Sequence, residues 1–224
     1  MTVIDYRTQT AGQDYVLEVR NSSAAQFDFV FFLPVPRRSP DGTYPLVWFA
    51  HSLAASTSGY STWQLTHALV WAETGLLKPG EILRPGQVLP AQLDSGNAAE
   101  VIRASGAYQF TNKTDGPPGK LTISPDGTIP ASTVSVGIGM SGKATFAVQA
   151  RPKRRVQFHP PAAPNYIVAA STSGIDTGQV LDGRAQSLTS HEVAPPANLY
   201  GAITELDGGN TWHVTYQSSL AVTG

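Results

Sequence analysis

The chain of 224 residues contains no cysteine, and only 14% of its residues are charged. The lack of cysteine excludes a disulfide scaffold, a thiolate metal site and a cysteine nucleophile. Typical domains carry roughly 25% charged residues, so this surface must either expose many neutral groups or be covered by a partner. The formal net charge of -1 gives the chain as a whole no attraction to nucleic acid, and we expect no nucleic-acid partner.

Long apolar runs are also missing. No stretch of about 18 apolar residues occurs, which excludes a helix that spans a membrane. The first residues, Met1–Arg7, lack the basic region and apolar stretch of a secretory signal. We therefore expect a soluble cytoplasmic protein with no membrane span, and release by a non-classical route stays open.

Catalytic motifs are absent as well. The five histidines show no H-x-H, H-x-x-x-H or HExxH spacing, and neither G-x-S-x-G nor S-x-x-K occurs. Many of the acidic residues fall in turns, where they favour turn geometry rather than acid–base catalysis. We predict no enzyme, no metal site, no catalytic residue and no cofactor. The acidic residues in turns are Asp41, Asp115, Asp126, Asp182 and Asp207.

The segment Gly137–Lys143 matches two phosphate-binding patterns, G-x-G-x-x-G and G-x-x-x-x-G-K. Both patterns require a helix after the glycine-rich loop, and the second requires Ser or Thr after the lysine. Here Ala144 follows the lysine, and residues 144–150 alternate as a strand does. We therefore interpret the segment as a strand of small residues that bends into a hairpin at 140–143.

Apolar residues alternate with polar ones along most of the chain, and turn residues separate the alternating runs. This pattern predicts an all-β fold, a jelly-roll-like antiparallel β-sandwich in a single domain, 1–224. Leu46–Ala50 is wholly apolar and predicts an interior strand, whereas Gln64–Glu73 fits a short helix or a strand. Further strands are expected at 15–20, 27–33, 108–110, 120–123, 145–150, 165–168 and 210–216.

A weak internal echo indicates two repeated halves, about 15–95 and 133–216. Phe27-x-Phe29 and the following Arg37-Arg38 correspond to Phe146-x-Val148 and the following Arg154-Arg155. Such echoes favour a duplicated half-domain whose copies pack as one unit. The alternative is that strand–turn–strand segments of one fold resemble each other by chance.

Basic residues are concentrated in two segments. The first segment holds Arg37 and Arg38. In contrast, no Lys or Arg occurs from Ala185 to Gly224. We predict that the two segments bind an anionic ligand or an acidic partner, and that the uneven charge supplies complementary faces for a homo-oligomer. The alternative is a pair of solvated hairpin tips. The second segment consists of Arg151, Lys153, Arg154 and Arg155.

Three tryptophans form a second candidate site. Trp63 and Trp71 lie in or near a Ser/Thr-rich stretch, and Trp212 follows an acidic turn. Exposed aromatic rings of this kind stack on sugars or contact another subunit. The alternative is that the rings belong to the core of the sandwich.

The residues Trp71-Ala72-Glu73-Thr74-Gly75, Val136–Gly142 and Thr145–Pro152 resemble the rhizosphere-induced protein (RhiA-like) family, and the likeness extends to Asn210-Thr211-Trp212. The resemblance implies a soluble bacterial protein without established biochemical activity, so it supplies no catalytic residues.

Three hypotheses about function follow from the sequence. The first is a non-catalytic β-sandwich protein that acts by self-association or partner binding. The second is a carbohydrate-binding module that uses the tryptophans. The third is a hydrolase whose catalytic groups converge only in three dimensions.

Overall fold

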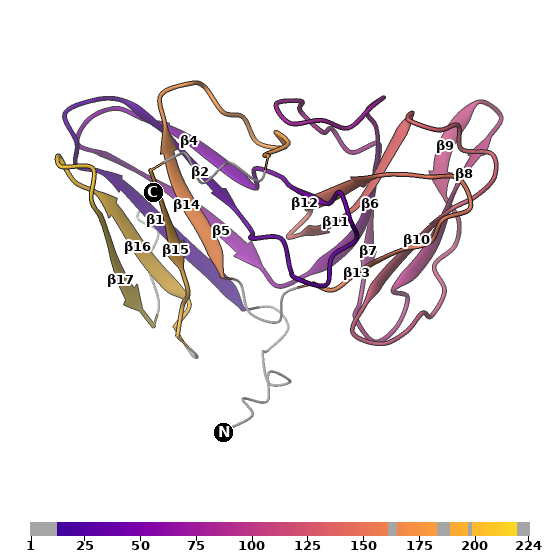
Figure 1. Ribbon diagram of the computed structural model, residues 1–224. Helices are drawn as coiled ribbons and strands as arrows, with labels where there is room; N and C mark the ends of the chain where they lie inside the picture. The colour runs from indigo at the N-terminus through magenta and orange to yellow at the C-terminus, as the bar shows by residue number, and fades with distance from the viewer. Residues whose placement is uncertain (1–12, 161–164, 183–188, 197–198, 219–224) are drawn as a thin grey trace.

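The computed structural model describes residues 13–160, 165–182, 189–196 and 199–218. Its regular elements are β-strands, and no helix occurs in these residues, so the expected all-β class is confirmed. Strands from the two ends of the chain form one pair of packed sheets, and strands from its middle form a second pair (Figure 1). We call these pairs the terminal sandwich and the central sandwich.

The terminal sandwich packs two four-stranded sheets, in the orders β17-β16-β1-β5 and β15-β14-β2-β4. Their side chains meet across the interior, where Trp63 of β5 lies against Tyr166 of β14. The strands of the first sheet are β1(Asp14–Asn21), β5(Thr57–Gln64), β16(Gly201–Leu206) and β17(Trp212–Gln217). Those of the second are β2(Phe27–Phe32), β4(Phe49–Leu53), β14(Tyr166–Ser171) and β15(Thr189–Val193).

The central sandwich packs a five-stranded sheet, β3-β12-β11-β6-β7, against a four-stranded sheet, β13-β10-β8-β9. The strands of the first are β3(Tyr44–Pro45), β6(His67–Glu73), β7(Gln87–Ala91), β11(Val134–Met140) and β12(Lys143–Gln149). Those of the second are β8(Ala98–Ala104), β9(Ala107–Phe110), β10(Leu121–Pro125) and β13(Val156–Phe158). Of the segment 64–73, for which the sequence fits a helix or a strand, residues 67–73 form β6, while Gln64 ends β5.

Among the described strands, pairing is antiparallel with two exceptions. β1 pairs with β16 in parallel, and β8 pairs with β10 in parallel. The predicted repeats, 15–95 and 133–216, do not coincide with the two sandwiches, because each repeat contributes strands to both. The duplication and the single-domain division stay predictions.

One hydrophobic core runs through both sandwiches. Alternation along β1 places Tyr15, Leu17 and Val19 on the face of the sheet that packs against this core, as the sequence predicts. Trp48 links the two halves: its ring contacts Trp63, while its Nε1–H donates to the carbonyl of Met140 at 3.1 Å. The sandwiches therefore share buried side chains instead of meeting only at the surface.

The predicted interior strand at Leu46–Ala50 is wrong in its extent. The chain forms the two-residue β3 before this run, and β4 begins only at Phe49. Leu46, Val47 and Trp48 are fully buried, but their backbone N–H groups donate to three different segments, through the carbonyls of Thr145, Gln179 and Phe31. The apolar run is buried because it crosses between the sandwiches, not because it lies inside one sheet.

The glycine-rich segment 137–143 forms the hairpin of β11 and β12. Ser141 and Gly142 both have positive φ, 52° and 75°, the combination that tight two-residue hairpin turns require. Gly137 has no room for a side chain, because a Cβ atom there would lie 2.0 Å from the carbonyl oxygen of Phe146. Backbone geometry thus explains these glycines, and no helix follows them.

Candidate functional site

The two basic segments of the sequence meet at one end of the central sandwich. The chain turns at 151–154, where the N–H of Arg154 donates to the carbonyl of Arg151 at 3.1 Å. Lys153 adopts a left-handed conformation there, with φ of 59°. The loop between β2 and β3 lies alongside, because Nδ1 of His159 donates to the carbonyl oxygen of Arg38 at 3.1 Å. Residues 121 positions apart are thereby brought into contact.

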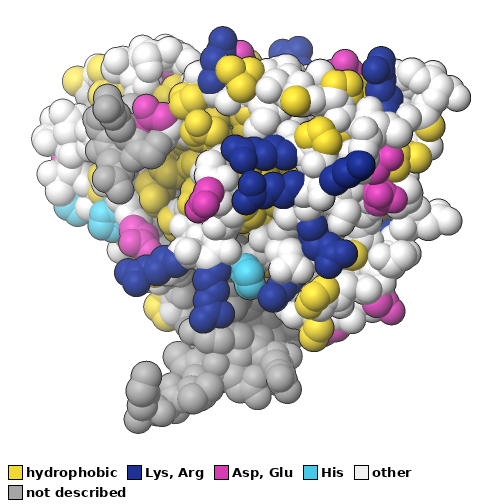
Figure 2. Space-filling model, turned by 45° about the vertical axis from the view of Figure 1, so that its right-hand side comes forward, with side chains coloured by type: hydrophobic (Ala, Val, Ile, Leu, Met, Phe, Trp, Pro, Cys, Tyr) yellow, Lys and Arg dark blue, Asp and Glu magenta, His cyan; other side chains and the backbone are white. Residues whose placement is uncertain are grey.

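A groove of about 570 Å³ opens between these segments, and we call it the arginine groove. Residues 39–41 form one wall, and residues 151 and 154–157 with the end of β12 form the other. Figure 2 shows Lys and Arg side chains gathered over this face of the molecule. The groove is lined by Ser39, Pro40, Asp41, Val148, Gln149, Arg151, Arg154, Arg155, Val156 and Gln157.

The arginine groove carries three guanidinium groups against one carboxylate, that of Asp41. Arg151, Arg154 and Arg155 are exposed, and within the described residues none of them forms an ion pair. Gln149 is occupied by its own fold, since its amide bonds to the backbone of Leu77, Gly75 and Val134. The groove therefore presents solvent-exposed positive charge, without an ion-pair partner among the described residues, on a wall held by backbone hydrogen bonds.

The other predicted basic residues do not line the groove. Arg37 and Arg38 are exposed on the neighbouring loop. The side chain of Lys153 lies over Gly127, where a Cβ atom would approach its Cε to 2.8 Å. The backbone N–H of Lys153 donates to the carbonyl of Pro125. Lys153 thus fastens the 151–155 turn to the end of β10 and adds no charge to the groove.

The three predicted tryptophans lie apart. Trp63 and Trp71 are only 3% and 8% exposed, so their rings pack in the core. Trp63 stacks on Tyr15 at 5.7 Å, and Nε1–H of Trp71 donates to Gln87 at 3.1 Å. Trp212 is half-buried at the outer strand β17 and packs edge-on against Phe29. A stacking platform on all three rings does not form, and glycan binding through Trp212 stays a prediction.

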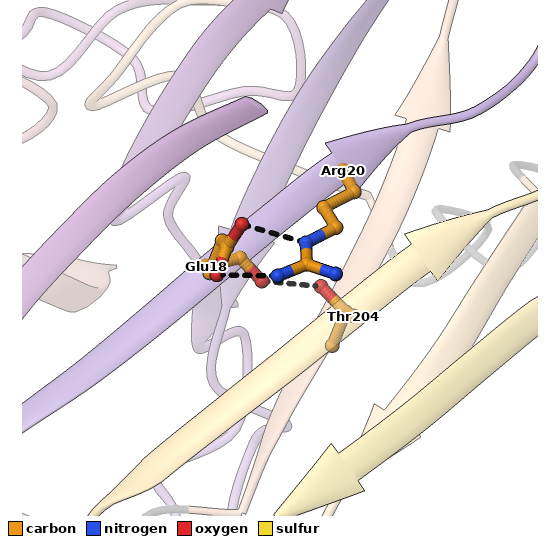
Figure 3. A network of polar contacts seen from close by, with 3 residues as sticks. All are labelled: Glu18, Arg20 and Thr204. Atoms are coloured by element: carbon orange, nitrogen blue, oxygen red, sulfur yellow. Dashed lines mark hydrogen bonds and ion pairs between the residues drawn. The ribbon is translucent and has the colours of Figure 1, made fainter. Parts of the chain in front are cut away.

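Arg20, unlike the arginines of the groove, is paired with a carboxylate of the same chain (Figure 3). Its Nε–H and Nη2–H groups donate to the two carboxylate oxygens of Glu18 at 2.6 and 3.1 Å. The hydroxyl of Thr204 on β16 donates to the backbone carbonyl of Glu18 at 3.4 Å. Hydrogen bonding to Glu18 raises the pKa of Arg20. This charge is neutralised internally and is not offered to a ligand.

A contact between a serine and a histidine was not predicted from the sequence, because no motif contains both residues. Nε2 of His51 lies 2.8 Å from Oγ of Ser61, across β4 and β5. Burial, and then the charge of Lys143, lowers the pKa of His51. Ser61 is only 4% exposed, and its hydroxyl therefore has little room for a substrate.

A second cavity, about 590 Å³, is lined by residues of both sandwiches. Its wall includes Arg84, Lys143 and Asp176, so both signs of charge are present. Nζ of Lys143 lies 4.0 Å above the ring of Phe49, and burial lowers its pKa. The arginine groove differs in degree, because three cationic side chains line it against one carboxylate, whereas two line this cavity against one.

Fold and groove together define a class, an all-β protein of two sandwiches that share one core and carry an arginine-lined groove. The RhiA family model matches residues 12–217, and the chain belongs to the RhiA family. It is 30% identical over 207 residues to Protein RhiA of Rhizobium leguminosarum bv. viciae, covering 91% of this chain and 87% of that protein. The family resemblance seen in the sequence is thus confirmed, and no solved structure matches. None of the described residues forms a helix long and apolar enough to cross a membrane.

Proposed function

We propose that the protein is non-catalytic and acts by binding a polyanionic partner in the arginine groove. One observation carries the proposal: Arg151, Arg154 and Arg155 converge on one groove without an ion-pair partner among the described residues. Guanidinium groups bind carboxylates and phosphates through paired, charge-assisted hydrogen bonds. Three such groups around one groove favour a ligand with several negative charges.

The local fold favours ligand binding over the alternative, in which residues 151–155 are a hairpin tip that contacts only solvent. The turn that carries the arginines is fastened by the backbone bonds of Arg154 and Lys153, so the guanidinium groups start from an ordered wall. Preorganisation of this kind lowers the entropy lost when a ligand binds. Asp41 on the opposite wall repels anions, and a ligand is therefore expected to lie toward 151–155.

The test uses polyglutamate and inorganic polyphosphate as probes, titrated by calorimetry at about 50 mM and about 300 mM salt. We expect binding that weakens with salt and that the double variant Arg154→Glu/Arg155→Glu reduces about tenfold or more. Because the two probes carry carboxylates and phosphates, their relative affinities identify the preferred anion.

The matched control is Arg84→Glu/Arg103→Glu, which changes net charge equally at exposed residues outside the groove. It is expected to keep binding within about threefold of the unaltered protein. Equal losses in both variants, or no binding of either probe at low salt, would contradict the proposal.

A further inference from the structure

Among the longer strands that end a sheet, β17, β5 and β4 contain no Lys, Arg, Asp, Glu or Pro. β4 and β5 contact each other, since Nε2 of His51 lies 2.8 Å from Oγ of Ser61, so β17 is the neutral end strand without a neutral neighbour of this kind among the described residues. β3, β13 and β9 have two, three and four residues. β7 contains Pro90, and β15 contains Glu192. Short strands, prolines and charges protect sheet edges from pairing with other chains. β17 has six residues, Trp-His-Val-Thr-Tyr-Gln, without Lys, Arg, Asp, Glu or Pro.

Within the described residues, β17 pairs with β16 alone. The hydrogen bond from the N–H of Asp207 to the carbonyl of Thr211, at 3.0 Å, sets the phase of this antiparallel ladder. Since bonded and non-bonded pairs alternate, Trp212, Val214 and Tyr216 direct their N–H and C=O groups away from β16. Their side chains pack on the core, so the strand is held, and no described residue forms a backbone hydrogen bond with its outer N–H and C=O groups.

We propose that β17 pairs antiparallel with β17 of a second copy of this chain, about a twofold axis at Val214. The register is self-complementary: Val214 faces itself, Trp212 faces Tyr216 of the second copy, and His213 faces Thr215. Aromatic cross-strand pairs stabilise sheets, and no like charges meet. All three outward-facing residues then complete their backbone hydrogen bonds, and two copies of the sheet β17-β16-β1-β5 become one.

Association through β17 does not depend on the arginine groove, which lies on the central sandwich. Sedimentation velocity over the micromolar range is expected to show a dimer of the unaltered protein. Val214→Pro removes an N–H that points away from β16, so the strand remains tolerable at a sheet edge while the dimer is weakened about tenfold or more. Arg154→Glu is expected to leave the dimer unchanged, which separates this proposal from the proposed function.

A second measurement leaves the backbone intact. Because the chain has no cysteine, His213→Cys/Thr215→Cys introduces the sole thiols, and the proposed register places them opposite each other. Oxidation is expected to yield a covalent dimer, whereas Asn112→Cys/Thr114→Cys, an exposed pair of the same spacing on the central sandwich, is expected to yield none. A monomer at every concentration, a dimer unaffected by Val214→Pro with native circular dichroism, or equal cross-linking of both cysteine pairs would overturn the proposal.

Discussion

At the scale of single residues, burial decides which charges are available. Glu18 is only 6% exposed, although it lies on the face of β1 that points away from the core. Arg20, two residues on, covers it and satisfies both carboxylate oxygens. The three arginines of the groove have no ion-pair partner among the described residues, so their guanidinium groups are available to bind a ligand.

Arg20→Ala is expected to destabilise the fold by about 1–3 kcal/mol, because it leaves the carboxylate of Glu18 buried and without its partner. Urea unfolding followed by tryptophan fluorescence measures the loss. Adding Glu18→Gln to Arg20→Ala is expected to recover part of it, since the amide carries no charge to bury. Unchanged stability of Arg20→Ala would show that the pair contributes nothing to the fold.

At the scale of strands, alternation is a good predictor where one face is buried and a poor one elsewhere. β17 alternates along its whole length and was predicted for that reason, whereas β2 and β12, which were also predicted, are apolar on both faces and buried on both. β5 was missed, since its sequence, TSGYSTWQ, is dominated by small polar residues. β5 is a strand because it pairs along its whole length with β1, a contact that no local pattern contains.

Gly137→Ala is expected to cost about 3 kcal/mol or more, because the new Cβ would overlap the backbone of Phe146 and force β11 and β12 apart. Thermal and chemical unfolding measure the effect. Gly208→Ala, with open space around the added atom, serves as control and is expected to change stability by about 0.5 kcal/mol or less. Equal effects at both positions would rule out crowding as the cause.

At the scale of the whole molecule, stability is expected to depend on two histidines in different sandwiches. Burial lowers the pKa of His51 and of His67, and the charge of Lys143 contributes at His51. The unfolded chain, with histidine pKa values of about 6.5, therefore binds more protons than the folded one below that pH. Stability present at about pH 7.5 falls as the pH approaches about 5, by at most about 1.4 kcal/mol per pH unit for each group.

Denaturation midpoints between about pH 7.5 and about pH 5 measure this slope. His51→Gln/His67→Gln is expected to flatten it. The hydrogen bond with His213 is the largest cause that lowers the pKa of Asp207. The contribution of Asp207 to stability is therefore lost only at more acidic pH, through and below the usual pKa range of an aspartate. An unaltered slope in the double variant would assign the pH dependence to other groups.

By itself the sequence determined the all-β class, the hairpin at Ser141-Gly142, the family and the two segments in which basic residues gather, because these depend on local spacing and composition. Only the tertiary structure decided that residues 39–41 meet 151–157, that Lys153 turns away, and that Trp63 and Trp71 are buried. Those outcomes depend on contacts between residues far apart in the chain. The low charge noted at the outset therefore has a definite distribution: three arginines without an ion-pair partner among the described residues line one groove, and the outer strand β17 carries no charged residue.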